Sequence, residues 1–77
     1  MKRRSMEIIH IHSAFIKLDQ LLKFAGIVES GAMAKQIILL ENILVNNEIC
    51  TQRGKKIYPK DIVTIKNYGQ ITVQKEE

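Results

Sequence analysis

The sequence predicts an α+β fold, in which two short helices pack on a small, mainly antiparallel sheet. Residues 6–12 are rich in isoleucine and have the composition of a strand. Residues 15–42 carry two stretches of helical periodicity, and residues 43–74 return to short β-branched runs separated by turns. Helices and most of the strands are thus segregated along the chain, which is typical of α+β proteins. At 77 residues the chain is expected to form a single domain, 1–77, because separate cores need longer chains.

The first helix is expected over roughly residues 15–25, with ends uncertain by about 2–4 residues. Ser13 offers a start for this helix, and Gly26 supplies a left-handed stop. Four apolar residues at positions i, i+3, i+4 and i+7 form its core stripe. These residues are Leu18, Leu21, Leu22 and Ala25.

A second helix is expected from Gly31 to Glu41 or Asn42, with Ser30 as its N-cap. Its core stripe consists of Ala34, Ile37 and Ile38. Three more apolar residues lie off this stripe, namely Met33, Leu39 and Leu40. Apolar residues at helical spacing are usually core, so we expect a wide sheet to cover them. The alternative is an exposed apolar face that binds a protein partner.

The remaining segments are short strands and turns. Asn46-Asn47 is a turn that tolerates positive φ. The expected order after the helices is a strand at 43–45, a return strand at 48–50, a polar loop at 51–56, a turn at 58–61, a strand at 62–66, a turn at 67–70 and a strand at 71–74.

Basic residues exceed acidic residues and concentrate in one loop. The chain has 12 Lys and Arg against 8 Asp and Glu, a formal net charge of +4, which favours a polyanionic partner. Residues 53–60 carry four of these cations: Arg53, Lys55, Lys56 and Lys60. A loop of this kind in an arbitrary protein is usually a solvated turn, so whether it binds a partner depends on the residues that lie near it.

The sequence offers no catalytic constellation, and we expect no enzyme activity, no cofactor and no metal site. His10 and His12 share one face of a strand, but a structural metal site needs about four ligands. Cys50 is the one cysteine, lies near no activating group and is expected to be buried. A single cysteine fits a reducing compartment. Because no hydrophobic signal segment or stretch of about 18 apolar residues occurs, we expect a soluble, cytoplasmic protein with no membrane partner.

Residues 17–47 as a set resemble the S4 RNA-binding domain, whose sequences read R-L-D-x-x-L, then S-R-x-x-A-R-x-x-I, then V-x-V-N-G. The matching segments here are Lys17-Leu18-Asp19-Gln20-Leu21-Leu22, then Ser30-Gly31-Ala32-Met33-Ala34-Lys35-Gln36-Ile37-Ile38, then Val45-Asn46-Asn47. Gly26 between them and Pro59, Asp61 and Val63 after them also fit. The resemblance implies a core motif over about 15–66 with the family's alpha-L fold, two packed helices on a small bent sheet, here extended by an N-terminal strand. It is similar in particular to small stand-alone bacterial S4 proteins associated with ribosomal RNA or ribosome assembly.

The resemblance assigns RNA contacts to Lys17, Ser30, Gly31, Lys35, Gln36 and the basic loop with Arg53, Lys55, Lys56 and Lys60. The start of the second helix presents free backbone N–H groups and the positive end of a dipole, which suit a phosphate. We therefore predict a cationic groove, formed by this helix start and the basic loop, that binds structured RNA. The expected partners are ribosomal RNA and, with it, ribosomal subunits or assembly proteins, bound by a monomer. The alternative function is a protein-interaction adaptor that uses the apolar face of the second helix.

Overall fold

The structure is a computed structural model that describes residues 6–76. Two helices and seven strands occur within this range. In chain order they are β1 (Met6–Ile11), β2 (Ile16–Lys17), α1 (Leu18–Phe24), α2 (Gly31–Leu39), β3 (Ile43–Val45), β4 (Glu48–Ile49), β5 (Lys56–Ile57), β6 (Ile62–Ile65) and β7 (Gly69–Lys75). The predicted α+β class, with two helices on a mainly antiparallel sheet and an added N-terminal strand, is confirmed.

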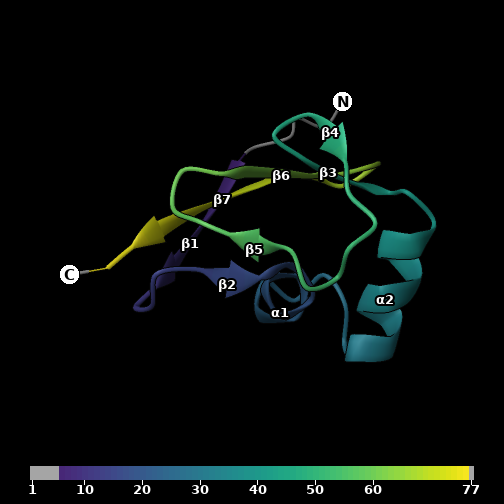
Figure 1. Ribbon diagram of the computed structural model, residues 1–77, viewed down its shortest axis with the longest axis horizontal. Helices are drawn as coiled ribbons and strands as arrows, with labels where there is room; N and C mark the ends of the chain where they lie inside the picture. Colours follow the sequence, from purple (N-terminus) through teal and green to yellow (C-terminus); the bar gives the residue numbers. More distant parts are fainter. Residues whose placement is uncertain (1–5, 77) are drawn as a thin grey trace.

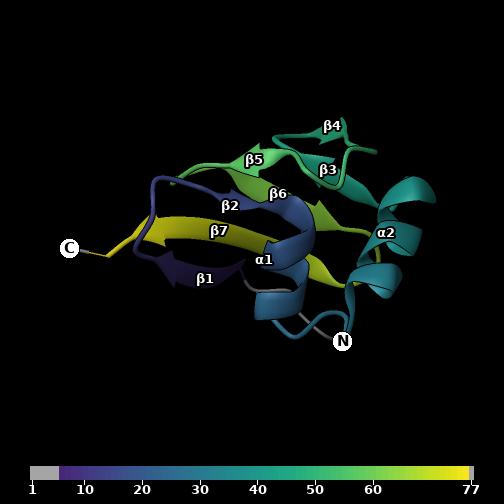
Figure 2. The same ribbon diagram turned by 60° about the horizontal axis from the view of Figure 1, so that its bottom comes forward.

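Five strands form one sheet in the order β1-β7-β6-β3-β4 (Figure 1). Three of its pairings are antiparallel, and β1 pairs with β7 in parallel. The parallel pair places the first and last strands of the described chain side by side. The remaining strands, β2 and β5, form a separate two-stranded antiparallel sheet next to the start of α1 (Figures 1 and 2).

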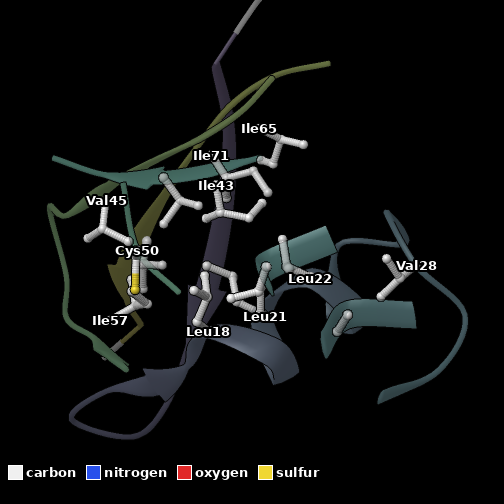
Figure 3. Close-up of a cluster of buried hydrophobic side chains, with 14 of the residues drawn as sticks. Leu18, Leu21, Leu22, Val28, Ile43, Val45, Cys50, Ile57, Ile65 and Ile71 are labelled. Atoms are coloured by element: carbon white, nitrogen blue, oxygen red, sulfur yellow. The ribbon is translucent and has the colours of Figure 1, made fainter. Parts of the chain in front are cut away.

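The core lies between one face of the five-stranded sheet and α1. Leu18, Leu21 and Leu22 of the predicted stripe are completely buried, and they point toward Ile43 and Ile71 of the sheet (Figure 3). Burial of each such side chain contributes roughly 1.5–3 kcal/mol. The α2 helix adds Ala34 and Ile38, both fully buried, so the predicted stripe of the second helix also faces the core.

The first helix begins three residues later than predicted. Ile16 and Lys17 pair with Ile57 and Lys56 as strands and are therefore held in extended conformation. Ser13 lies before this pairing, where its hydroxyl donates a hydrogen bond to the carbonyl of Phe15. The pairing with a strand 40 residues further along overrides the local helix signal.

Both helices end in the same hydrogen-bonding pattern. At the end of α1, the Gly26 and Ile27 N–H groups donate to the carbonyls of Lys23 and Leu22 over 3.0 Å each, with Gly26 at φ +76°. At the end of α2, the Glu41 and Asn42 N–H groups donate in the same way to Ile38 and Ile37 (3.1 and 3.2 Å), with Glu41 at φ +63°. Each is a Schellman motif. The α2 helix therefore ends at Leu39, before the predicted Glu41 or Asn42.

The sheet does not cover the apolar residues that lie off the stripe of α2. Met33, Leu39 and Leu40 are 44%, 56% and 67% exposed. The expectation that they belong to the core was wrong. The α2 helix lies at the end of the sheet (Figure 2), and it packs against the core with Ala34, Ile37 and Ile38.

Candidate nucleic-acid interface

The start of α1 gathers four of the predicted RNA-binding residues. Lys17 is the N-cap residue of α1, and its partner across the β2–β5 pair is Lys56. No side chain caps the helix. Instead, the Leu18 N–H donates to the Lys55 carbonyl over 2.9 Å and the Asp19 N–H donates to the Arg53 carbonyl over 3.0 Å. The backbone of the basic loop thus caps α1.

This capping has an electrostatic consequence. Because the loop carbonyls occupy the first N–H groups of α1, these groups are not free to bind a phosphate. The side chains of Lys17, Arg53, Lys55 and Lys56 all remain exposed. The positive charge at this end of α1 is therefore presented by side chains rather than by the helix backbone.

The outer face of the β2–β5 pair adds two aromatic residues to these cations. Side chains alternate between the faces of a strand, so Ile16 and Ile57 face inward while Lys17 and Lys56 face outward. Phe15 and Tyr58, one residue beyond the pair on either strand, return to the outer face. Their ring centroids lie 5.7 Å apart at an interplanar angle of 51°, and the Lys56 Nζ lies 4.9 Å from the centroid of Phe15.

Neither Phe15 nor Tyr58 is among the residues that the sequence predicted to bind RNA. The signal is a mirrored pattern, Phe15-Ile16-Lys17 in one segment and Lys56-Ile57-Tyr58 in the other. This pattern can be recognised only when the two segments are known to pair, because each segment alone is too short to predict a strand.

The start of α2 has the local structure that was predicted. The Ser30 hydroxyl accepts a hydrogen bond from the Met33 N–H over 3.2 Å, as an N-cap does. Gly31 has open space where a side chain would lie, with no atom within 4 Å of an added Cβ. Lys35 and Gln36 are exposed one turn later and, with Ala32 and Leu39, line a shallow hollow of ≈ 320 Å³.

The predicted site residues thus fall into two groups and one outlier. The first group surrounds the start of α1 (Lys17, Arg53, Lys55 and Lys56), and the second lies on α2 (Ser30, Gly31, Lys35 and Gln36). Lys60 is separate, at the turn between β5 and β6. Over residues 6–76, no hydrogen bond or ion pair joins the basic loop to α2. Figures 1 and 2 show the loop beside α1, on the part of the molecule that also carries α2. Convergence of the two groups in one groove stays a prediction.

Comparison with known proteins decides the family. The S4 domain family matches residues 9–74. The chain belongs to this family. The match confirms the resemblance inferred from the sequence. Because S4 domains bind RNA, it also supports RNA binding at the level of the family. The chain is also similar to a protein of Bacillus subtilis (strain 168) named "Probable ribosome maturation protein RlbA". The two are 40% identical over 65 residues, which cover 84% of this chain and 92% of that protein.

Two residues of the S4 pattern, Asn46 and Asp61, hold the sheet together. The Asn46 side chain donates to Asp61 Oδ1 over 3.1 Å and accepts from the Ile62 N–H over 2.9 Å. Asp61 Oδ2 accepts from the Tyr58 N–H over 2.8 Å. Both oxygens of this carboxylate are occupied, and they fix the turn that follows β5. Asn46 and Asp61 therefore stabilise the turns before β4 and β6.

Cys50 and the histidines, which were considered for catalysis or metal binding, have ordinary surroundings. Cys50 is buried, as expected, and its thiol lies 3.6 Å from the Gln52 carbonyl. His12 Nε2 lies 3.3 Å from Glu76 Oε1 on the surface. Within residues 6–76, no three His, Cys, Asp or Glu side chains are grouped so as to hold a metal ion. None of the helices in this range is long and apolar enough to span a membrane.

Proposed function

We propose that this S4 domain binds structured ribosomal RNA without catalysis, in the cytoplasm, as part of ribosome maturation. One observation carries the proposal: four cationic side chains from separate segments gather around the start of α1. Strand pairing joins Lys17 to Lys56, and the carbonyls of Arg53 and Lys55 cap α1, which supports a concentration of positive charge at this helix start. Such a surface suits the phosphates of a folded RNA.

The comparisons support the ribosomal part of the proposal. The relative from Bacillus subtilis carries ribosome maturation in its name, and its similarity extends over nearly its whole length. Ribosomal RNA is then the RNA class to test first, and ribosomal subunits or assembly proteins are the partners to expect. The single, buried, unpaired cysteine supports a reducing compartment such as the cytoplasm.

Charge reversal at the start of α1 tests this function. The double substitution Lys17→Glu with Arg53→Glu is expected to weaken binding of ribosomal RNA fragments at least 10-fold at moderate salt, since it removes two phosphate contacts and adds repulsion. The matched control, Lys66→Glu with Lys75→Glu, makes the same change of net charge on exposed residues elsewhere. Affinity is measured by fluorescence anisotropy. Equal losses for the two double variants, or no binding of any RNA at low salt, would refute the proposal.

The exposure of Met33, Leu39 and Leu40 favours a second candidate function, a protein-interaction adaptor. Its test is Leu39→Asp with Leu40→Asp, followed by pull-down of ribosomal subunits. The adaptor function predicts loss of subunit recruitment while affinity for isolated RNA stays unchanged. RNA binding as the main function predicts that recruitment survives.

A further inference from the structure

The outer face of the β2–β5 pair combines features that are not needed for the core. We define the aromatic platform as Phe15, Lys17, Lys56 and Tyr58. The inward-facing Ile57 is completely buried and already supplies the core contact of this small sheet. Tyr58 is 46% exposed, and over residues 6–76 its hydroxyl makes no hydrogen bond to another protein group. A large aromatic ring is thus displayed next to the paired residues Lys17 and Lys56.

The platform is held in place before any ligand arrives. The Tyr58 N–H is fixed to Asp61, and the Tyr58 ring rests against Phe15 at a tilt. Lys56 lies over the Phe15 ring, which limits its freedom as well. Because these groups are ordered by the protein itself, a ligand that stacks here loses less free energy to ordering.

The charge pattern identifies the ligand chemistry. Lys17 and Lys56 lie on the platform itself, and Lys55 and Lys60 flank it in sequence. The nearest carboxylate in the turn, Asp61, already has both oxygens engaged by Asn46 and Tyr58. An aromatic face bordered by cations matches a nucleotide, whose base offers a π-face and whose neighbouring phosphates are anionic.

We propose that Tyr58 stacks on an unpaired base of the bound RNA while Lys17 and Lys56 bind the flanking phosphates. The inference rests on the proposed function and specifies the kind of RNA that is bound. A base inside a continuous duplex is stacked on both faces and cannot reach a side chain, whereas bases in loops and bulges can be splayed out. The RNA recognised by this protein therefore contains an unpaired base beside its helical part.

Tryptophan fluorescence reports stacking directly, because the chain contains no tryptophan. The variant Tyr58→Trp places the sole indole on the platform. Two ribosomal RNA hairpins serve as probes, and both are closed by the same stable tetraloop. One carries a single-base bulge in its stem, and the stem of the other is fully paired. The control variant Tyr68→Trp places the indole at a residue 50% exposed in the turn at the other end of β6.

The bulged hairpin is expected to quench the Tyr58→Trp signal strongly and the paired hairpin to quench it weakly. The Tyr68→Trp signal should respond little to either RNA. In the otherwise native chain, Tyr58→Leu keeps an apolar contact with Phe15 and is expected to lower affinity for the bulged hairpin about 10-fold, while Tyr58→Phe retains it. Thermal unfolding checks that each variant is folded.

The outcomes separate this inference from the proposed function. Salt-dependent binding of both hairpins with no quenching at Tyr58→Trp, and with Tyr58→Leu as tight as the native chain, overturns the platform but leaves RNA binding intact. Absence of binding by any variant to either hairpin at low salt overturns both. Equal quenching by the two hairpins also overturns the requirement for an unpaired base.

Discussion

At the scale of single residues, the S4 pattern contains both cations that face the solvent and polar residues that hold the fold. Asn46 and Asp61 belong to the second kind, because their side chains join the β3–β4 turn to the β5–β6 turn. The resemblance to the S4 pattern covers both kinds of residue, but it assigned RNA contacts to Lys17 and Lys35 and no role to Asn46 or Asp61. The hydrogen bonds of Asn46 and Asp61 show that these two residues stabilise the turns of the fold.

The role of Asp61 can be tested through stability. Asp61→Ala removes the acceptors for Asn46 and for the Tyr58 N–H, and a lost hydrogen bond at a partly exposed site costs roughly 1 kcal/mol. We therefore expect a fall of about 1–2 kcal/mol in the free energy of unfolding, measured by urea denaturation. Asp61→Asn keeps one side-chain oxygen as an acceptor and should cost less. Equal stability of Asp61→Ala and the native chain would show that the turns do not depend on this carboxylate.

The two aromatic residues mark the limit of prediction at this scale. Residues 15–17 and 56–58 are separated by about half of the chain, and neither has the length or alternation that identifies a strand. Their pairing is a tertiary interaction, and it lies next to the loop carbonyls that cap α1. Lys17 and Lys56 could be named as cations from the sequence, but the face that they share with Phe15 and Tyr58 could not be predicted.

At the scale of elements, the ends of the two helices show why one boundary was predicted better than the other. Both helices finish in a Schellman motif that requires one residue with positive φ. In α1 that residue is Gly26, a signal visible in the sequence. In α2 it is Glu41, which carries no such signal and has high helix propensity. The predicted second helix, which ended at Glu41 or Asn42, was therefore longer than the observed α2, which ends at Leu39.

The same comparison predicts opposite effects of two substitutions. Gly26→Ala forces a Cβ into the left-handed region and should destabilise the protein by about 1 kcal/mol, although the added Cβ meets no atom within 4 Å. Glu41→Gly relieves that strain and should stabilise it by up to about 1 kcal/mol, less the entropy that a glycine adds to the unfolded chain. Thermal unfolding of both variants measures the effects. Shifts of the same sign would contradict the proposed equivalence of the two helix ends.

At the scale of the whole molecule, β1 and β7 join the two ends of the described chain. Ile11 at the end of β1 is 6% exposed and belongs to the core, whereas Ile8 on the opposite face of the strand is 48% exposed. The N-terminal strand was predicted from its isoleucines, but its parallel pairing with the last strand could not be, because pairing between distant segments leaves no local pattern. The strand is part of the fold and not an appendage to it.

Substitution on the two faces of β1 tests this conclusion. Ile11→Ala is expected to lower the free energy of unfolding by about 2–4 kcal/mol, the usual cost of truncating a buried isoleucine. Ile8→Ala removes the same atoms from an exposed position and should cost less than about 1 kcal/mol. Chemical denaturation followed by circular dichroism provides both values. Similar small losses for the two variants would mean that β1 contributes little to the core.

The last question at this scale is whether α2 and the basic loop act as one surface. If a single RNA contacts both, Lys35→Ala and Lys56→Ala should each reduce the slope of log affinity against log salt by roughly 0.7–0.9, and the double variant by about the sum, because each lysine releases the counterions of one phosphate. Lys66→Ala, on an exposed residue beyond β6, should leave the slope unchanged. Titrations of one ribosomal RNA fragment at four or more salt concentrations give these slopes. A slope unaffected by Lys35→Ala but reduced by Lys56→Ala would confine the interface to the start of α1 and leave the outer face of α2 free for another partner.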